Sequence, residues 1–208
     1  MGHSSAKPVG YPLHVIGPDG RISRSFGSET GVFRSDVPGS VARSIARSVS
    51  SSMWSAHQSS YMIDLIDIDT GLITKRIERV ASWFPPGEKP RTAPRPAMSA
   101  PMPQIGAIQV AADRLREVFL NVPDSRWRSA VTLAVGAKHP TVIDADRITD
   151  AILEVIDVRR GTLVASMRVD RTPATFVAPG LMRRADTSAT GASVIRIERA
   201  ALTNPQRK

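Results

Sequence analysis

The sequence predicts an all-β protein built from repeated units of four antiparallel strands. Along the chain, apolar residues alternate with polar ones or form short β-branched runs, which is the period of strands and not of helices. The 16 prolines and 14 glycines imply many turns. A chain of 208 residues suits one domain. We place this domain at residues 11–202, between a flexible N-terminal tail at 1–10 and a C-terminal tail at 203–208.

The composition restricts the chemistry that is open to the chain. Because no cysteine is present, disulfides, thiolate nucleophiles and cysteine-based zinc sites are excluded. The net charge of +9 is dispersed along the chain. Residues 1–104 include 12 basic and 8 acidic side chains, and residues 105–208 include 16 basic and 11 acidic ones. We therefore do not expect a nucleic-acid partner. No run reaches about 18 apolar residues, and the segment after Met1 lacks signal-peptide features, so we expect neither a membrane span nor a signal peptide.

The first predicted elements are a hairpin and two further strands. The hairpin covers Leu13 to Gly27, where a Gly-Pro-Asp-Gly turn at 17–20 joins two short strands. A gap at 27–40 follows. The next predicted strands are 41–46 and 52–57, and the second of them contains Trp54. We expect Trp54 to pack in the core.

The clearest hairpin covers residues 61–77. Its two strands flank Asp69-Thr70-Gly71, where the glycine is free to take a positive φ at the turn. Asp64 and Asp67 alternate with apolar residues in its first strand. Asp64 points to the opposite face from Asp67 and Asp69, so the three carboxylates do not converge on a metal, and we interpret them as solvated strand and turn aspartates.

A proline-rich insertion is predicted at residues 85–103. Seven of the 16 prolines lie between Trp83 and Pro103, and proline cannot donate to a ladder of hydrogen bonds. We interpret the stretch as an extended connector with polyproline character. A recognition motif for a proline-reading partner is the alternative, and loop-length statistics favour a plain insertion.

The second half of the chain contains one ambiguous segment. A strand is predicted at 105–111, and the next residues, 112–121, have the propensity of a short helix that Asp113 would cap. The alternative is a turn followed by a strand at 115–120. A helix there would favour an α+β domain instead of an all-β one. Further strands are predicted at 152–157, 163–169, 175–177, 181–184 and 192–199.

An internal repeat favours the strand at 115–120. Residues 64–73 align with 154–163 so that the order acidic, apolar, apolar, Asp, apolar, two turn residues and Gly is shared. A strand pair precedes each of these hairpins, so each unit has four strands. Four antiparallel strands repeated every 40–45 residues or so are typical of the blades of a β-propeller. The segment 122–149 then becomes an insertion within the second unit.

These residues resemble a known family of repeat proteins. The hairpin at Leu13 to Gly27 is similar to the outer hairpin of NHL-type six-bladed β-propellers, Met53-Trp54-Ser55 to the strand before such a hairpin, and 152–170 to a later copy. The chain most resembles the C-terminal part of bacterial six-bladed propeller proteins of uncharacterised function. The resemblance implies a periplasmic or extracellular location, because such proteins are commonly exported.

The length departs from that family. A six-bladed ring needs roughly 240–270 residues, so this chain supplies a partial propeller of about three to four blades. Such a chain is a piece of a larger propeller, a partial ring that closes with another copy, or an open sheet structure. Unpaired edge strands favour self-association in each case.

We find no catalytic or metal-binding constellation in the sequence. No Gly-x-Ser-x-Gly elbow or glycine-rich phosphate loop is present. His14, His57 and His139 have no base partner that the sequence assigns. The acidic residues Asp144, Asp146 and Asp150 fit capping and turn chemistry as well as they fit a site. We therefore expect no catalytic residue, metal or cofactor.

Four residues are the candidates for contacts with a ligand or partner. His57 ends a predicted inner strand and could face a propeller channel. Trp83 borders the proline-rich insertion, while Trp127 and Arg128 lie in the predicted loop after Pro123. Aromatic and arginine side chains in loops dominate many binding surfaces.

The sequence therefore favours a non-enzymatic binding or scaffold module. It would bind a protein, a peptide or a small ligand on a loop face. The alternative is a hydrolase or lyase in the propeller channel, with or without a metal, which would need acidic, Asn or His side chains from several blades to converge. Only two asparagines, Asn121 and Asn204, are available for such a site.

Overall fold

The computed structural model describes residues 13–26, 43–48, 51–58, 60–84, 99–111, 114–137, 139–169, 175–178 and 180–200. The predicted tails at 1–10 and 203–208 lie outside the described residues, as does most of the proline-rich insertion. The chain divides into two compact units, 1–93 and 94–208. The border between the units falls within the predicted insertion at 85–103. One domain over 11–202 stays a prediction.

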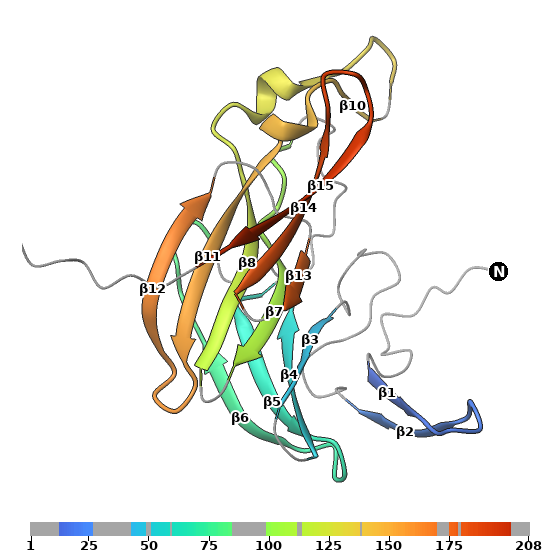
Figure 1. The fold of residues 1–208 in the computed structure, drawn as a ribbon, viewed down its shortest axis with the longest axis vertical. Coiled ribbons are helices and arrows are strands. Elements are labelled where there is room, and N and C mark those ends of the chain that lie inside the picture. Colours follow the sequence, from blue (N-terminus) through green and yellow to red (C-terminus); the bar gives the residue numbers. More distant parts are fainter. Residues whose placement is uncertain are drawn as a thin grey trace, which may run out of the picture. The chain divides into compact units, whose positions relative to one another are not determined.

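Unit 1 contains a two-stranded hairpin and a four-stranded antiparallel sheet (Figure 1). The sheet has the order β3-β4-β5-β6, so each strand pairs with its neighbour in sequence. Its strands alternate in direction, because short turns join consecutive strands. The elements of this unit are β1 (Leu13–Ile16), β2 (Ile22–Phe26), β3 (Arg43–Arg47), β4 (Ser52–His57), β5 (Met62–Asp67) and β6 (Ile73–Glu78).

Unit 2 contains a second four-stranded antiparallel sheet, of order β12-β11-β8-β7, and a three-stranded sheet, of order β13-β14-β15. A pair of two-residue strands and two short 3-10 helices lie between β8 and β11. The elements are β7 (Gln104–Ala111), β8 (Arg114–Pro123), η2 (Trp127–Ala130), β9 (Val131–Thr132), β10 (Thr141–Val142), η3 (Ala145–Arg147), β11 (Thr149–Asp157), β12 (Thr162–Val169), β13 (Thr175–Ala178), β14 (Leu181–Thr187) and β15 (Ser193–Arg199).

The predicted all-β class is confirmed, and so are the four-stranded antiparallel sheets. The described part of the ambiguous segment at 112–121, residues 114–121, is a strand, because β8 runs from Arg114 to Pro123 and pairs with both β7 and β11. A helix there is wrong. Local propensity allowed a helix, but two neighbouring strands offer β8 a ladder of hydrogen bonds on each side. The described residues contain no α-helix.

The repeat extends to the backbone of the turns. Gly71 and Gly161, which align in sequence, have φ angles of 75° and 69°. Their N–H groups each donate to the carbonyl of the aspartate four residues earlier, Asp67 and Asp157, and both distances are 2.7 Å. Glycine suits these positions because a positive φ costs it no steric strain. The two turns therefore share one conformation, as the alignment predicts.

The repeat also places an irregularity at the same point of each sheet. The register of β5 on β6 shifts between Leu65 and Ile66, and that of β11 on β12 shifts between Val155 and Ile156. These pairs are aligned in the two copies. A shift of this kind bends a strand and increases its twist, so the β5–β6 and β11–β12 hairpins are built alike.

The core of unit 1 includes both faces of its sheet. Trp54, Ala56 and Ile63 are buried on one face, which confirms the predicted core position of Trp54. Ser55, His57 and Asp64 are buried on the other face. Tyr61, which precedes β5, forms an aromatic cluster with Trp83 and Phe84, which follow β6. The ring centroids are 5.5–6.0 Å apart.

The two larger sheets of unit 2 pack against each other. Ala151 and Leu153 of β11 form a buried cluster with Met182 of β14. The partly buried side chains against this cluster are Ala107, Val169, Phe176 and Ala200.

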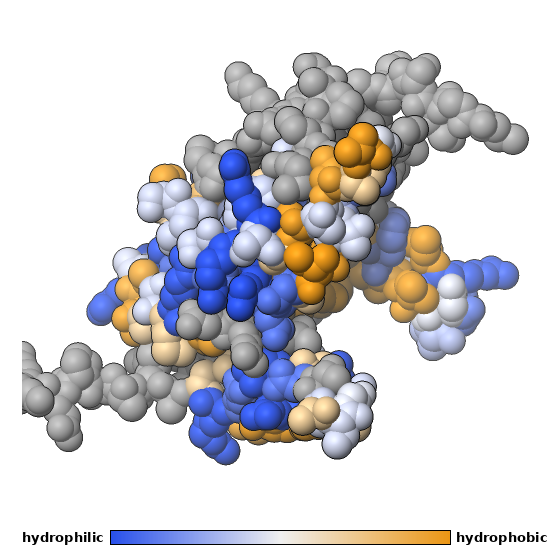
Figure 2. Space-filling view, turned by 90° about the horizontal axis from the view of Figure 1, so that it is seen from above, coloured by the Kyte–Doolittle hydropathy of each residue, from blue (hydrophilic) through white to orange (hydrophobic). Residues whose placement is uncertain are grey.

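Many apolar side chains nevertheless remain at the surface, where Figure 2 shows orange hydrophobic groups beside blue hydrophilic ones. Contiguous exposed apolar groups often mark interaction sites.

Candidate functional site

A long connection that contains η2, β9, β10 and η3 joins β8 to β11 in unit 2. We call residues 124–148 the insertion loop. It leaves the sheet at Pro123 and returns at Thr149, and these two residues pair with each other in the β8–β11 ladder. The connection is shorter than the predicted insertion at 122–149, because residues 122 and 123 belong to β8 and residue 149 to β11. Its two ends start from neighbouring strands. Loops of this length in compact domains often carry function.

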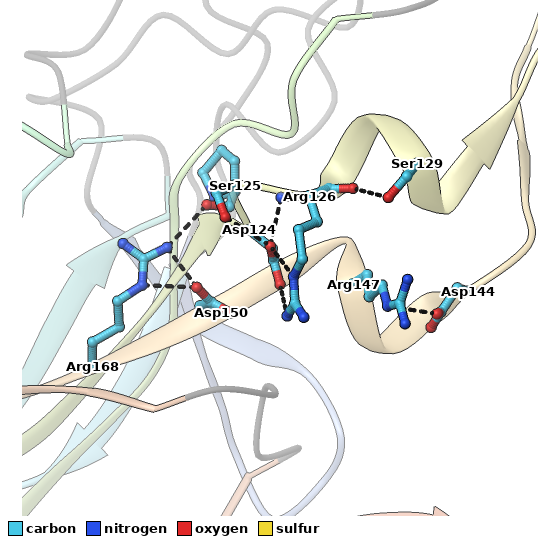
Figure 3. Close-up of polar contacts among 9 residues, drawn as sticks. Asp124, Ser125, Arg126, Ser129, Asp144, Arg147, Asp150 and Arg168 are labelled. Carbon is cyan, nitrogen blue, oxygen red and sulfur yellow. Dashed lines mark hydrogen bonds and ion pairs between the residues drawn. The ribbon is translucent and has the colours of Figure 1, made fainter.

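A buried carboxylate fixes the first residues of the insertion loop. Oδ1 of Asp124 accepts a hydrogen bond from the backbone N–H of Arg126 at 2.6 Å, and Oδ2 accepts one from Nη2 of Arg126 at 2.7 Å (Figure 3). The side-chain and backbone hydrogen bonds from Arg126 hold the pKa of Asp124 well below its usual value. The turn is therefore closed by a carboxylate that stays charged at neutral pH.

A second arginine ties the two ends of the insertion loop together. Arg168 of β12 donates from Nε to Oδ2 of Asp150 at 2.7 Å and from Nη2 to the carbonyl of Pro123 at 3.2 Å (Figure 3). Pro123 is the last residue of β8, and Asp150 is near the start of β11. One guanidinium therefore holds both strands where the loop leaves and returns.

The remaining members of the predicted acidic cluster do not form a metal site. Asp144 pairs with Arg147 at 3.1 Å within the loop, and Asp146 is exposed. Within the described residues, no group of three or more His, Cys, Asp or Glu is arranged to hold a metal. Asp144 and Asp150 instead act through ion pairs that shape the loop and its ends.

The backbone of the insertion loop is also internally bonded. The N–H of Asp124 donates to the carbonyl of Ile148 at 3.2 Å, and the N–H of Ile143 donates to the carbonyl of Ala130 at 2.9 Å. Ala130 is fully buried. These bonds join the two arms of the loop, so its conformation does not depend on the arginine pairs alone.

The insertion loop exposes apolar and aromatic side chains. Val135 is fully exposed, and Leu133, Val142 and Ile143 are also exposed. Trp127 is half-buried, with the guanidinium of Arg128 at 5.5 Å from its ring centroid. The two predicted contact residues Trp127 and Arg128, which are neighbours in the chain, thus lie on the same loop as a set of exposed aliphatic groups.

These aliphatic residues were not among the predicted contact residues. The signal was present as short apolar stretches, Val131 to Val135 and Thr141 to Ile143, inside a segment interpreted only as an insertion. The strands β9 and β10 form only a two-stranded pair, and such a pair has too few neighbours to bury much apolar surface by itself. Apolar residues in such a pair are therefore candidates for exposure.

The predicted contact residue His57 lies in a buried polar network of unit 1. Its Nε2 is 3.3 Å from Oδ2 of Asp64, and Arg76 donates from Nε to Oδ1 of Asp64 at 2.7 Å. Arg43 pairs with His57 in the β3–β4 register, so it lies on the same face. His57 is 5% exposed and Asp64 is 2% exposed. The interpretation of Asp64 as a solvated aspartate is wrong, because Arg76 and His57 compensate its burial.

The charges of this network oppose protonation of His57. Burial lowers the pKa of His57, and the positive charges of Arg43 and Arg76 lower it further, against the opposing influence of Asp64. Burial raises the pKa of Asp64, but hydrogen bonds from His57 and Arg76 outweigh it, so the pKa is lowered overall. The network is a neutral imidazole beside an ion pair, which is a common structural arrangement.

The predicted contact residue Trp83 lies in the aromatic cluster of unit 1. It is half-buried and packs with Tyr61 and Phe84, while Arg79 lies 5.1 Å from the ring centroid of Tyr61. Trp83 and His57 belong to unit 1, whereas Trp127 and Arg128 belong to unit 2. Trp127 and Arg128 are consecutive residues whose side chains contact each other.

Comparisons with known proteins add no relatives. No family model, curated protein or solved structure matches this chain. In the part of the chain that the structure describes, no helix combines the length and the hydropathy of a membrane span.

Proposed function

We propose that this chain is a non-enzymatic binding module that contacts a protein or peptide through the insertion loop at 124–148. The observation that carries the proposal is the combination of a fixed loop backbone with exposed apolar side chains. Apolar side chains that are exposed to water have an unfavourable solvation free energy, and this free energy is gained when a partner covers them. Their persistence on an ordered loop supports a binding role.

The arginine pairs support the proposal through preorganisation. Asp124 with Arg126, and Asp150 with Arg168, hold the ends of the loop before any partner arrives. A loop that is already ordered loses less conformational entropy on binding. Trp127 and Arg128 are of the residue types that contribute most to binding energy in protein interfaces.

The fold supports the wider proposal of a partial β-propeller. Two four-stranded sheets with sequential strand order and matching outer hairpins are what consecutive blades require. We therefore keep the expectation that the chain is part of a larger, NHL-type six-bladed propeller of bacterial origin. A hydrolase or lyase in the channel has less support, because the buried His57 is directed to a carboxylate that Arg76 already holds.

The proposed function can be tested by peptide selection on the immobilised chain. A random peptide library displayed on phage is selected against the wild type and then measured against Val135→Asp. We expect the enriched peptides to bind the variant at least about tenfold more weakly, because a charge would face the apolar side of the peptide.

The matched control is Val80→Asp in unit 1. Val80 is 87% exposed and Val135 is fully exposed, so both substitutions add the same charge at solvated positions. Enriched peptides that bind both variants equally well would overturn the insertion loop as the site. Failure to enrich any peptide over an unrelated all-β protein would overturn the binding function.

A further inference from the structure

The three-stranded sheet of unit 2 has one covered face and one open face. Phe176 and Met182 point to the covered face and pack on the neighbouring four-stranded sheet. Successive side chains of a strand alternate between faces. The described side chains of the opposite face, which we call the open face, include Leu181, Arg183, Ala185, Ile195, Ile197 and Arg199.

The strand register places these residues side by side. Arg183 pairs with Ile197, Ala185 with Ile195, and Leu181 with Arg199. Ile195 is 62% exposed and Ile197 is 55% exposed. The centre of the open face is therefore a solvated aliphatic surface with an arginine on each of two neighbouring strands.

The neighbouring sheet shows how such a strand is arranged when both of its faces are covered. Residues Ala151 to Ile156 of β11 are all buried, and because consecutive residues point to opposite faces, both faces of β11 are shielded from water. In β15 no described residue is buried. The open face thus contains isoleucines of the kind found on a covered sheet face, but these isoleucines are exposed to solvent.

The charges of this sheet are sorted between its faces. Its acidic residues Asp186 and Glu198 lie on the covered face, where Arg184 and Arg196 pair with Asp186 at 3.0 and 2.9 Å. Arg184 also pairs with Glu198 at 3.4 Å. The described side chains of the open face therefore include positive charges and no negative ones.

We propose that the open face binds a protein surface that combines apolar side chains with carboxylates. Charge complementarity selects this occupant, because Arg183 and Arg199 would each gain a carboxylate partner while Ile195 and Ile197 are covered. A second copy docking through its own open face would bring arginines together, which is repulsive. This surface is formed by residues outside the insertion loop, so the inference does not rest on the proposed function.

A pair of designed β-hairpin peptides provides the probe. In one peptide, valine and glutamate alternate on one face, and in the matched peptide lysine replaces each glutamate. Binding to the full chain is measured by fluorescence anisotropy at low salt. We expect the glutamate peptide to bind and the lysine peptide to bind at least about tenfold more weakly.

Variants assign the binding to this face. Arg183→Glu with Arg199→Glu is expected to weaken binding of the glutamate peptide by about tenfold or more and to improve binding of the lysine peptide. Arg21→Glu with Arg160→Glu is the charge control, since it changes the net charge by the same amount and both arginines are exposed. Ile195→Asp is expected to remove binding, with Ile16→Asp as its control, because Ile16 has a similar exposure of 64%. Circular dichroism confirms that each variant folds.

Three results would overturn the proposal. The first is equal binding of both peptides, or binding that the paired charge reversal leaves unchanged. The second is a dimer in light scattering at low salt that Ile195→Asp dissociates and the charge reversal does not affect, which would make a second copy the occupant. The third is tighter binding to phosphatidylserine vesicles than to the glutamate peptide, which would make the face a membrane contact.

Discussion

At the scale of single residues, the network around His57 makes stability depend on pH. Folded His57 has a pKa below its ordinary value of 6.5, so the unfolded chain binds the proton more readily. The corresponding stabilisation is present above pH 6.5 and is lost as the pH falls below that value toward the lowered folded pKa. The lowered pKa of Asp64 also stabilises the fold at higher pH, but this contribution is lost only as the pH falls below the ordinary pKa of 3.8.

We expect His57→Gln to flatten the pH dependence of the free energy of unfolding between pH 7 and about 5. Glutamine cannot take up a proton, so it removes the titration while it keeps a neutral polar group beside Asp64. Urea unfolding at several pH values measures the effect, with His14→Gln as the control, since His14 is hydrogen-bonded to Ser25 on an exposed hairpin. An unchanged pH dependence in His57→Gln would show that other groups cause it.

At the scale of elements, the turn between β5 and β6 contacts the first hairpin. A Cβ at Gly71 would lie 3.1 Å from Cβ of Phe26, and the φ of Gly71 is +75°. Arg24 of the same hairpin also donates to the carbonyl of Ile68 at 2.9 Å. The turn glycine is therefore needed both for its own backbone and for the close approach of β2.

We expect Gly71→Ala to lower the free energy of unfolding more than Gly20→Ala does. Both glycines have a positive φ, which costs alanine about 1–2 kcal/mol, but nothing lies within 4 Å of a Cβ at Gly20. Crowding against Phe26 adds about 1 kcal/mol or more. Thermal or urea unfolding of the two variants tests this, and equal losses would contradict the contact with Phe26.

Strands and turns were predictable because their sequence signals are local. Side-chain contacts between residues far apart in the chain were not predictable. The period of apolar residues and the turn glycines predicted the hairpins, and the repeat predicted β8 as a strand. The clamp of Arg168 on Asp150 and Pro123 joins residues that are 18 and 45 positions apart, so no short motif indicates it. His57 and Asp64 are seven apart, and their pairing depends on a register that the sequence alone leaves open.

At the scale of the whole molecule, the net charge of +9 acts against self-association. The sequence predicts self-association through open edges, and the aliphatic open face offers a further surface for it. Two copies of net positive charge repel each other, and Arg183 and Arg199 place positive charges on the open face. Salt screens this repulsion over a Debye length of about 10 Å at 0.1 M and about 3 Å at 1 M, while apolar contacts persist.

We therefore expect the chain to associate more strongly as the salt concentration rises. Light scattering on the purified chain at about 0.05 M and about 1 M sodium chloride measures the mass, and the apparent mass should increase at the higher concentration. Ile195→Asp should reduce this increase, because it removes apolar surface from the open face, whereas Ile16→Asp controls for the added charge. An association that weakens with salt would instead mean that opposite charges hold the copies together, and the edges and the open face would not be its cause.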